Sequence, residues 1–483
     1  MTFLGHHDSD DGLERSSCLH LAEVLPKLKN VSDSAMLHRR EFLQVGSSTF
    51  FGLTLPALLG RQAAAATTDR RAKSVVLVFL TGGGAHLDTF DPKPDVADVR
   101  GEFQAIPTRV PGIQFTEILP KLADRANRLA VVRSMAHNDN RHLSGTHNTL
   151  TGAIQPFRGS SNLDKSLNRS DWPCYGSAVK YLRPLPNGLP GQVTLPRPLF
   201  DGTTTWPAQH AGFLGPKYDP FQLNEDLNEY DFQVSGLCLP DGLSIGRLDR
   251  RFQLLREMER RQENLNESPS GQAFTRHQQA AYSMLTSGTL KKALRIQDES
   301  PKNRERYGHH DYGQILLLAR RLVEAEIPVI QCTMGRVNNW DTHYDHFPLV
   351  KSKLPKLDQS LSTFLDDLVD RGLLDQTLVV CVGEFGRTPK IWTLPGRKLP
   401  GRHHWSWGYS AVFAGGGVQG GQVIGKTDRV GGYPVTVPFH PNDMGATIYD
   451  SLGIDPATQV HDRLARPHRL NYGKVMDGLF SGA

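Results

Sequence analysis

Cysteine is scarce in this chain. The 483 residues contain only five cysteines, and no two of them form a Cys-x-x-Cys pair. Small disulfide-dependent domains are rich in cysteine, and structural zinc sites use closely spaced cysteine pairs. The sequence therefore argues against a disulfide framework and against a cysteine-based zinc site. Cys332 and Cys381 lie inside apolar runs, where a small buried thiol is the common role.

Blocks of basic charge are also missing. The 55 Lys and Arg residues are dispersed among 50 Asp and Glu residues, which leaves a formal net charge of +5. Proteins that bind nucleic acids commonly concentrate their basic residues, so we expect no nucleic-acid partner. With 38% hydrophobic and 22% charged residues, the chain has the composition of a globular enzyme with one or two large domains.

A helix that spans a membrane needs about 20 consecutive apolar residues, and the N-terminal region has no such run. Its apolar segment, residues 45–59, is interrupted by Gly, Ser and Thr, follows the pair Arg39-Arg40, and precedes the alanine run 63–66. This order resembles a twin-arginine export signal with cleavage near Ala65 or Ala66. It predicts a periplasmic or extracellular protein that uses the twin-arginine export machinery and keeps no stable membrane span after cleavage.

This signal divides the chain into predicted parts. Residues 1–35 form either an unusually long start of the signal or a dispensable extension from a start codon assigned too early, since Met36 lies just before the arginine pair. Residues 36–66 are the predicted signal peptide, and residues 74–483 are predicted to form a single domain. Within that domain, residues 157–239 are rich in Pro, Gly, Ser and Asn and are predicted to be a loop-rich insertion.

Apolar runs and amphipathic segments alternate along the rest of the chain. The runs predict buried strands at 74–80, 129–132, 328–332, 378–382 and 409–413, and helical periodicity predicts helices at 315–323, 357–368 and 443–452. A charged, solvent-facing helix is predicted at 247–266. Such alternation is typical of an α/β protein whose mostly parallel sheet is flanked by helices on both faces.

Acidic and imidazole side chains follow several predicted strands, where ligands bind in sheets of this kind. These candidate metal ligands are Asp88, Asp341, His343, Glu384, His403 and His404. Mixed carboxylate and imidazole ligands suit Zn²⁺ or Mn²⁺, whereas oxygen ligands alone favour Ca²⁺ or Mg²⁺. We predict a divalent metal site and leave the choice among these four ions open. The alternatives are a surface ion pair at Glu384 and an aromatic surface patch around His403 and His404.

Two further segments supply candidate catalytic residues. His137, His142 and His147 crowd a stretch that has no helical or strand period before Asn148, and this composition predicts a site loop. Arg387 follows Glu384 by three residues, and a guanidinium there is suited to bind a planar or tetrahedral anion.

The ordered motifs resemble a known family. In sequence order they include LTGGGAHLDTFDPKPD, VVRSMAHN, WDTH, DQTLVVCVGEFGRTP and GRHHWSWG. From about Ser74 to the C-terminus the chain is similar to the secreted family of unknown function numbered 1501. That family is similar to the sulfatase and alkaline-phosphatase superfamily. The resemblance implies an alkaline-phosphatase or sulfatase-like fold and the hydrolysis of sulfate or phosphate esters with divalent metals.

The chain departs from the superfamily pattern at several positions. Glu384 corresponds to a metal-binding Asp, but Phe385 replaces a His ligand, and no Cys-x-Pro-Ser-Arg motif is present. His142 takes the place of the nucleophile, and Ser144 is one of the nearest hydroxyls. The resemblance thus implies either an exported metal-dependent hydrolase or a catalytically inactive relative that serves in the envelope as a binding or structural protein. In the first case His142, Ser144 and Arg387 are the predicted catalytic residues, and the substrate is a small-molecule or polysaccharide ester.

Overall fold

The computed structural model describes residues 70–155, 168–183, 189–227, 242–261 and 288–481, together with single residues between these ranges. The predicted extension, the predicted signal peptide and both cleavage positions lie outside the described residues, so they remain predictions. Within the described ranges, no helix combines the length and the apolar composition that crossing a bilayer requires.

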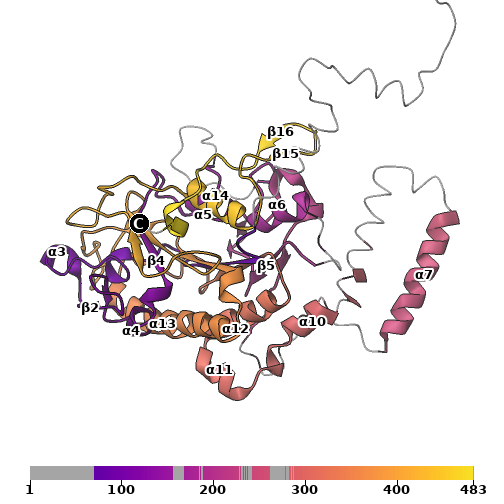
Figure 1. Ribbon diagram of the computed structural model, residues 1–483, viewed down its shortest axis with the longest axis horizontal. Coiled ribbons are helices and arrows are strands. Elements are labelled where there is room, and N and C mark those ends of the chain that lie inside the picture. The colour runs from indigo at the N-terminus through magenta and orange to yellow at the C-terminus, as the bar shows by residue number, and fades with distance from the viewer. Residues whose placement is uncertain are drawn as a thin grey trace, which may run out of the picture. The chain divides into compact units, whose positions relative to one another are not determined.

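A mixed sheet forms the centre of the described part (Figure 1). Its eight strands follow the spatial order β14-β4-β13-β10-β1-β9-β5-β8, with the bounds Gln422–Ile424, Ala130–Met135, Tyr409–Ala414, Thr377–Val382, Ser74–Phe79, Val329–Thr333, Gln192–Leu195 and Phe221–Gln222. Strand β13 is antiparallel to both of its neighbours, and the other pairs are parallel. The predicted mostly parallel sheet is confirmed.

Helices cover both faces of this sheet (Figure 1). On one face lie α12 (Asp311–Glu324) and α13 (His346–Asp370), and on the other lie α5 (His142–Thr151), α6 (Tyr175–Leu182) and α14 (Pro441–Ser451). Successive side chains of a strand point to opposite faces. Accordingly, Val76 and Val78 of β1 belong to the apolar cluster of α12 and α13, whereas Val75, Leu77 and Phe79 belong to the cluster of α5, α6 and α14.

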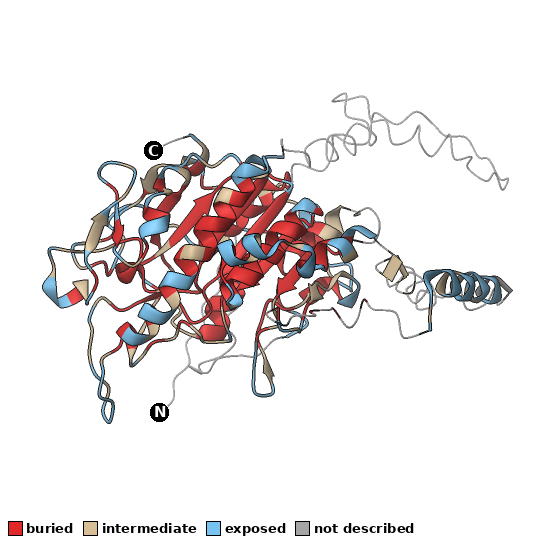
Figure 2. Ribbon diagram, turned by 90° about the horizontal axis from the view of Figure 1, so that it is seen from below, coloured by how far each residue is buried: buried red, intermediate tan, exposed pale blue. Residues whose placement is uncertain are grey.

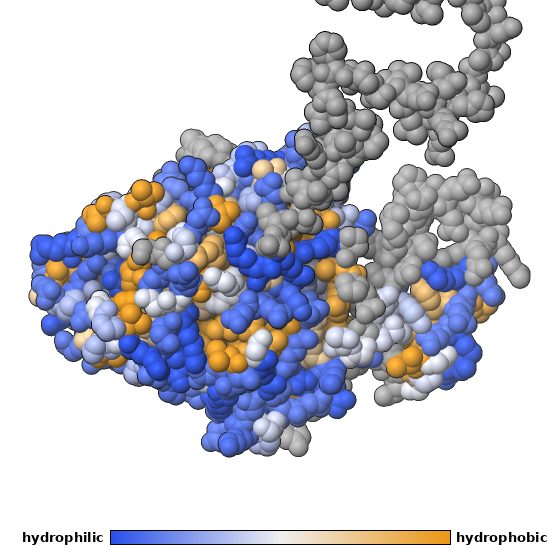
Figure 3. Space-filling view, viewed as in Figure 1, coloured by the Kyte–Doolittle hydropathy of each residue, from blue (hydrophilic) through white to orange (hydrophobic). Residues whose placement is uncertain are grey.

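Burial follows this layered arrangement. Every residue of β1 and β10 is buried, and buried residues concentrate in the sheet and the helices packed on it (Figure 2). Helix α7 (Ile245–Arg261) is mostly exposed, as its charged sequence predicted. Hydrophilic residues predominate on the visible surface in Figure 3, with apolar residues interspersed.

Shorter elements connect these parts. The helices are α3 (Ala97–Arg100), α4 (Pro120–Ala123), α10 (Gly288–Leu294), α11 (Pro301–Tyr307) and α15 (Gly478–Ser481). The strands are β2 (Ala105–Pro107), β3 (Gln114–Thr116), β6 (Phe200–Asp201), β7 (Thr204–Thr205), β11 (Gly386–Arg387), β12 (His404–Trp405), β15 (Gln459–His461) and β16 (Pro467–Arg469).

Two regions differ from what the sequence predicted. The stretch expected to be a site loop contains α5, a helix whose ten residues are all buried. Only two of those residues, Leu143 and Leu150, are strongly apolar, so hydrophobic periodicity could not reveal the helix. The loop-rich segment contributes α6 and two strands of the main sheet, β5 and β8. These strands are too short to give a clear pattern in the sequence.

Candidate metal centre

The candidate site lies where β1 and β10 end side by side, with Phe79 opposite Val382. After β1 the chain turns at Gly82, whose φ of 105° favours glycine. A Cβ atom at this position would lie 2.5 Å from the backbone nitrogen of Asp341. Glycine therefore lets the loop that carries Asp341 approach the end of β1.

Glu384 follows the end of β10, and its completely buried side chain lies against the turn at Gly82. The backbone N–H of Gly82 donates to Oε1 at 2.8 Å and to Oε2 at 3.0 Å. Oε1 also lies 2.7 Å from Nδ1 of His142. The geometry lets Glu384 orient His142, and Glu384 lies outside the group formed by His142, Asp341 and His404. Its role as a metal ligand stays a prediction from the sequence.

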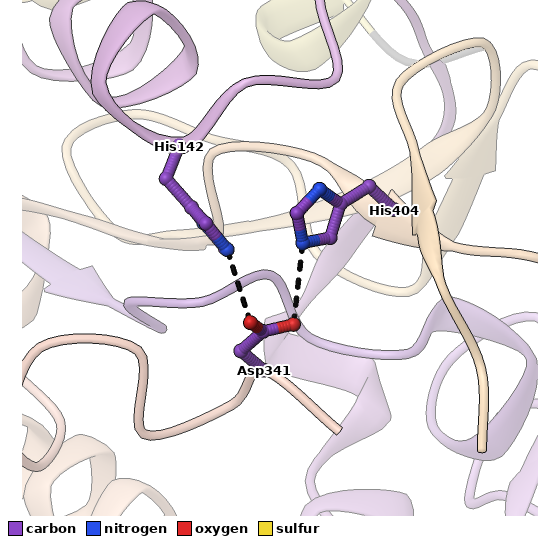
Figure 4. A group of neighbouring side chains, drawn as sticks. All are labelled: His142, Asp341 and His404. Atoms are coloured by element: carbon purple, nitrogen blue, oxygen red, sulfur yellow. Dashed lines mark hydrogen bonds and ion pairs between the residues drawn. The ribbon is translucent and has the colours of Figure 1, made fainter. Parts of the chain in front are cut away.

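Three side chains from distant parts of the chain converge in front of this turn (Figure 4). His142 begins α5, Asp341 lies in the loop after β9, and His404 begins β12. Nε2 of His142 lies 3.2 Å from Oδ2 of Asp341, and Nε2 of His404 lies 3.3 Å from Oδ1. One potential ligand atom from each residue falls within a group that spans no more than 4.8 Å. The three residues can therefore hold one metal ion.

The outer nitrogen of each imidazole supports this orientation. Nδ1 of His404 lies 2.8 Å from the carbonyl oxygen of Asn140, and a carbonyl can only accept a hydrogen bond. Nδ1 therefore donates, and in the neutral ring Nε2 carries the lone pair. The Glu384 carboxylate faces Nδ1 of His142 in the same way. A carbonyl or carboxylate behind the ring is the usual support of a metal-binding histidine.

The charge on His142 is opposite in sign to the charges on the carboxylates of Asp341 and Glu384. Burial disfavours the charged form of His142, but the hydrogen bonds with Asp341 and Glu384 outweigh burial and raise the pKa of His142 to about 9. Burial opposes ionisation of Asp341 too, yet hydrogen bonds from the histidines and the Arg387 charge hold its pKa well below the usual range. Without a metal, a proton on His142 balances the carboxylates. A divalent cation would compete with that proton for Nε2.

Arg387 is buried and already has acceptors for its donors. Nη1 lies 2.6 Å from Oδ1 of Asp341 and 3.3 Å from the carbonyl oxygen of Arg402. Nε donates to the carbonyl oxygen of Gly83 at 3.0 Å, and Nη2 donates to that of Gly82. The guanidinium thus fixes Asp341 against the glycine turn. This position differs from the anion-binding role that the sequence predicted.

His343 and His403 extend the centre outward. Nε2 of His343 lies 3.1 Å from Oδ1 of Asp341 and 2.9 Å from Nε2 of His404. Its Nδ1 lies 2.6 Å from Nδ1 of His403. The His403 ring stacks on Trp392 with the ring centres 3.9 Å apart, and burial and nearby positive charges lower the pKa of His403 to about 4. His343 thus lies within hydrogen-bond distance of both Asp341 and His404, and His403 lies behind it.

A family model matches residues 72–480, and its description is a protein of unknown function, DUF1501. The chain belongs to the DUF1501 family. The family indicated by the sequence motifs is thereby confirmed. Among curated proteins, none matches this chain.

Solved structures similar to this DUF1501 protein are distant. An alkaline phosphatase from the Antarctic bacterium TAB5 is 10% identical with a TM-score of 0.36, and the match covers 80% of this chain and 99% of the other. The PsFucS1 sulfatase from Pseudoalteromonas sp. is 12% identical with a TM-score of 0.35, and the match covers 82% of this chain and 70% of the other. The phosphonate monoester hydrolase SpPMH from Silicibacter pomeroyi is 12% identical with a TM-score of 0.35, and the match covers 86% of this chain and 77% of the other. Likeness this low transfers no activity to the DUF1501 chain.

Asp88 is separated from the converging ligands of this DUF1501 protein. Its fully buried carboxylate accepts hydrogen bonds from Arg402, at 2.7 and 3.1 Å, and from Nε2 of His346 at 2.8 Å. Burial opposes ionisation, but these two partners outweigh it and lower the pKa of Asp88 to about 2. Nδ1 of His346 pairs with Thr342 Oγ1 at 2.6 Å, next to Asp341 in the chain. Asp88 therefore supports the loop that carries Asp341, in contrast to its predicted role as a ligand.

Ser144 is also away from the cluster. It follows His142 by two residues of α5, and residues two apart leave a helix in nearly opposite directions. Gly145, three residues after His142, is the position whose added Cβ would contact Glu384, at 3.2 Å. The face of α5 that meets the centre thus carries His142 and Gly145, and Ser144, one of the predicted catalytic residues, lies off that face.

The sequence missed part of the wall around His142. The ring of Phe385 lies 5.0 Å from that of His142 and 4.7 Å from that of His404. On another side, the ring of Trp206 lies 5.8 Å from that of His142. The sequence identifies Phe385 only as the replacement of a metal ligand. Trp206 lies in the loop-rich segment, where no pattern distinguished it.

Proposed function

We propose that this DUF1501 protein is an exported, metal-dependent hydrolase of sulfate or phosphate esters. The observation that carries the proposal is the convergence of His142, Asp341 and His404 at the carboxyl edge of the sheet. Two imidazoles and one carboxylate suit Zn²⁺ or Mn²⁺ better than Ca²⁺ or Mg²⁺. Three protein ligands are also the usual number in catalytic zinc sites, where a further position is left for water or substrate.

The residues present fit such an ion. When bound, the metal would supply Lewis acidity toward an ester oxygen and lower the pKa of a water molecule. Glu384 and the Asn140 carbonyl hold the two imidazoles by their Nδ1 atoms. Arg387 holds Asp341. This preorganisation keeps the ligands in place before substrate arrives.

The arrangement favours water over a side-chain nucleophile. Both ring nitrogens of His142 already face carboxylates. Ser144 lies off the helix face that meets the centre. The side chain of His142 is 10% exposed, that of Asp341 18%, that of His404 22% and that of His343 29%. Solvent and substrate therefore reach the centre most directly from the side of His343.

Export is part of the same proposal. It is supported by the twin-arginine resemblance of residues 36–66, which lie outside the described part. That route carries folded proteins, so the ligands can bind their metal before export.

A second function, metal binding without catalysis, is favoured by Arg387. Sulfate and phosphate esterases need positive charge beside the transferred group. Arg387, the predicted source of that charge, uses its guanidinium to bind Asp341 and backbone carbonyls. A binding protein would need only the ligands and their support.

Metal analysis of protein from the exported fraction, coupled to a panel of aryl sulfates and aryl phosphates, tests both functions. We expect about one tightly bound divalent ion per chain and turnover of at least one ester class. His404→Ala should abolish both, whereas His461→Ala, at an exposed position on β15, should change neither. Bound metal without turnover would establish the binding function, and a natively folded, metal-free protein would refute both.

A further inference from the structure

A cavity of about 440 Å³ opens at the same edge of the sheet as the metal centre. Its lining includes Thr333, the last residue of β9, and Arg197, which follows the end of β5 by two residues. Strand β9 lies between β5 and β1, and β1 leads into Gly82 of the centre. Neighbouring strands are about 4.8 Å apart. The cavity therefore lies one to two strand spacings, about 5–10 Å, from the strand end that supports the centre.

Two walls of this cavity continue into the metal centre. Val337 lines the cavity, and Asp341 follows it by four residues in the same loop. On the other wall, Leu199 accepts a backbone hydrogen bond from Trp206 at 3.0 Å, and the Trp206 ring lies against His142. The cavity lining is thus connected, through the loop of Asp341 and through Trp206, to residues of the centre.

The cavity contains two arginines, Arg197 and Arg336. Within the described part of the chain, the guanidinium groups of Arg197 and Arg336 make no hydrogen bond and no ion pair. The lining also includes one carboxylate, Asp201, which is exposed. This situation is opposite to that of Arg387, whose guanidinium is held by protein acceptors.

An adjoining cavity of about 230 Å³ shares both arginines. It adds three carboxylates, those of Glu225, Asp226 and Asp311, and each of them has an interaction partner. The arginines thus stand between an acidic cavity and a cavity in which positive charge prevails. An anion is expected to bind on the second side.

The lining indicates which anions fit. Guanidinium groups match the oxygens of sulfate, phosphate and carboxylate groups by forked hydrogen bonds. Phe200, which is 48% exposed, and Val337 offer apolar surface for the carbon skeleton between two anionic groups. The combination suits an organic molecule with a second acidic group more than a lone inorganic ion.

We propose that this cavity is a second anion subsite, in which Arg197 and Arg336 bind a sulfate, phosphate or carboxylate group of a substrate whose scissile ester lies at the metal centre. The substrate class is therefore an ester that carries at least one further oxyanion. The role in substrate recognition rests on the proposed ester hydrolysis, whereas anion binding by the two arginines does not.

Two probes of different charge test the subsite. Methyl phosphate offers one anionic group, and propane-1,3-diol bisphosphate offers two. Calorimetric titration of the folded, zinc-loaded protein should show about tenfold or tighter binding of the bisphosphate, the gain expected from one charge-assisted hydrogen bond or more. The double variant Arg197→Gln/Arg336→Gln should lose this advantage and keep its affinity for methyl phosphate.

Arg109→Gln is the matched control, because Arg109 is an exposed arginine in the turn between β2 and β3. It should leave both affinities unchanged, and circular dichroism should show that all variants fold. The subsite is refuted by equal binding of the two probes to the wild type, by an advantage that survives in the double variant, or by the same loss in Arg109→Gln.

Removal of zinc with EDTA separates this proposal from the proposed function. Methyl phosphate binding should disappear, while arginine-dependent binding of the bisphosphate should remain. If the wild type binds no metal and no methyl phosphate but still binds the bisphosphate through the arginines, the hydrolase proposal fails and the subsite stands. If bisphosphate binding is entirely lost with the metal, the separate subsite is refuted.

Discussion

Two acid–histidine clusters in this protein have similar composition and opposite accessibility. In the cluster of Asp88, Arg402 and His346, all three side chains are 0% exposed and the carboxylate is saturated by its partners. In the cluster of Asp341 and His404, the side chains are 18% and 22% exposed and the imidazole nitrogens point at the carboxylate from outside. The first is therefore a closed cluster, sealed from solvent, and the second is an open cluster that solvent can reach. Accessibility, more than residue type, separates a structural cluster from a candidate metal site.

The largest effect should come from breaking the closed cluster. Asp88→Asn removes the charge that compensates buried Arg402, and loss of one partner of a buried ion pair costs about 3–5 kcal/mol. We expect the free energy of unfolding, measured with urea, to fall by this amount. A variant of unchanged stability that has lost its metal would instead make Asp88 a ligand.

Breaking the open cluster should affect metal more than stability. His404→Ala removes a ligand whose side chain is only partly buried. We expect metal affinity to fall by more than about 100-fold, beyond the loss typical of supporting residues, with about 1 kcal/mol or less lost from stability. Competition with a chromogenic chelator measures the affinity. Retention of wild-type affinity would exclude His404 from the centre.

The proton on His142 gives the open cluster a pH dependence. Its pKa is raised above the ordinary value, to about 9, so its contribution to the stability of the metal-free protein is present below about pH 6.5 and is lost as pH rises through about 9. We expect a loss on the order of 2 kcal/mol between these values. Urea unfolding of the EDTA-treated protein measures it, and His142→Gln should flatten the difference. A wild-type curve that coincides with that of His142→Gln would contradict the assignment.

The smallest effect should come from the group behind His142. Glu384→Gln keeps an oxygen that can accept from Gly82 and from Nδ1 of His142 but removes the charge. Loss of such a supporting charge typically weakens metal affinity by about tenfold or somewhat more. Chelator competition should show this modest change. If Glu384→Gln were as severe as His404→Ala, Glu384 would be a direct ligand.

Much of the fold followed from the sequence. Residues 75–80 and 378–382 are apolar without interruption because their strands are buried on both faces, and this pattern can be recognised from the sequence alone. Helix α5 could not be predicted from hydrophobic periodicity, because its buried residues are largely polar. The strand end after 378–382 also located Glu384 and Arg387 correctly at the sheet edge.

The roles within the site were harder to predict. Asp88 and Asp341 look alike in the sequence, and only the partners folded around them distinguish them. Those partners, such as His346 for Asp88 and Arg387 for Asp341, come from other segments. Trp206 and the carbonyl of Asn140 give no chemical signal in the sequence, because one is an aromatic residue in a loop and the other is backbone.

The separation of the ligands along the chain has a consequence for maturation. Asp341 lies 199 positions from His142 and 63 positions from His404, and the supporting contact of His142 with Glu384 spans 242 positions. Contacts this distant form late in folding, since closing such loops is slow. A chain truncated before residue 404 would lack the complete ligand set. Occupancy of the centre would thus report that nearly the whole domain has reached its final topology.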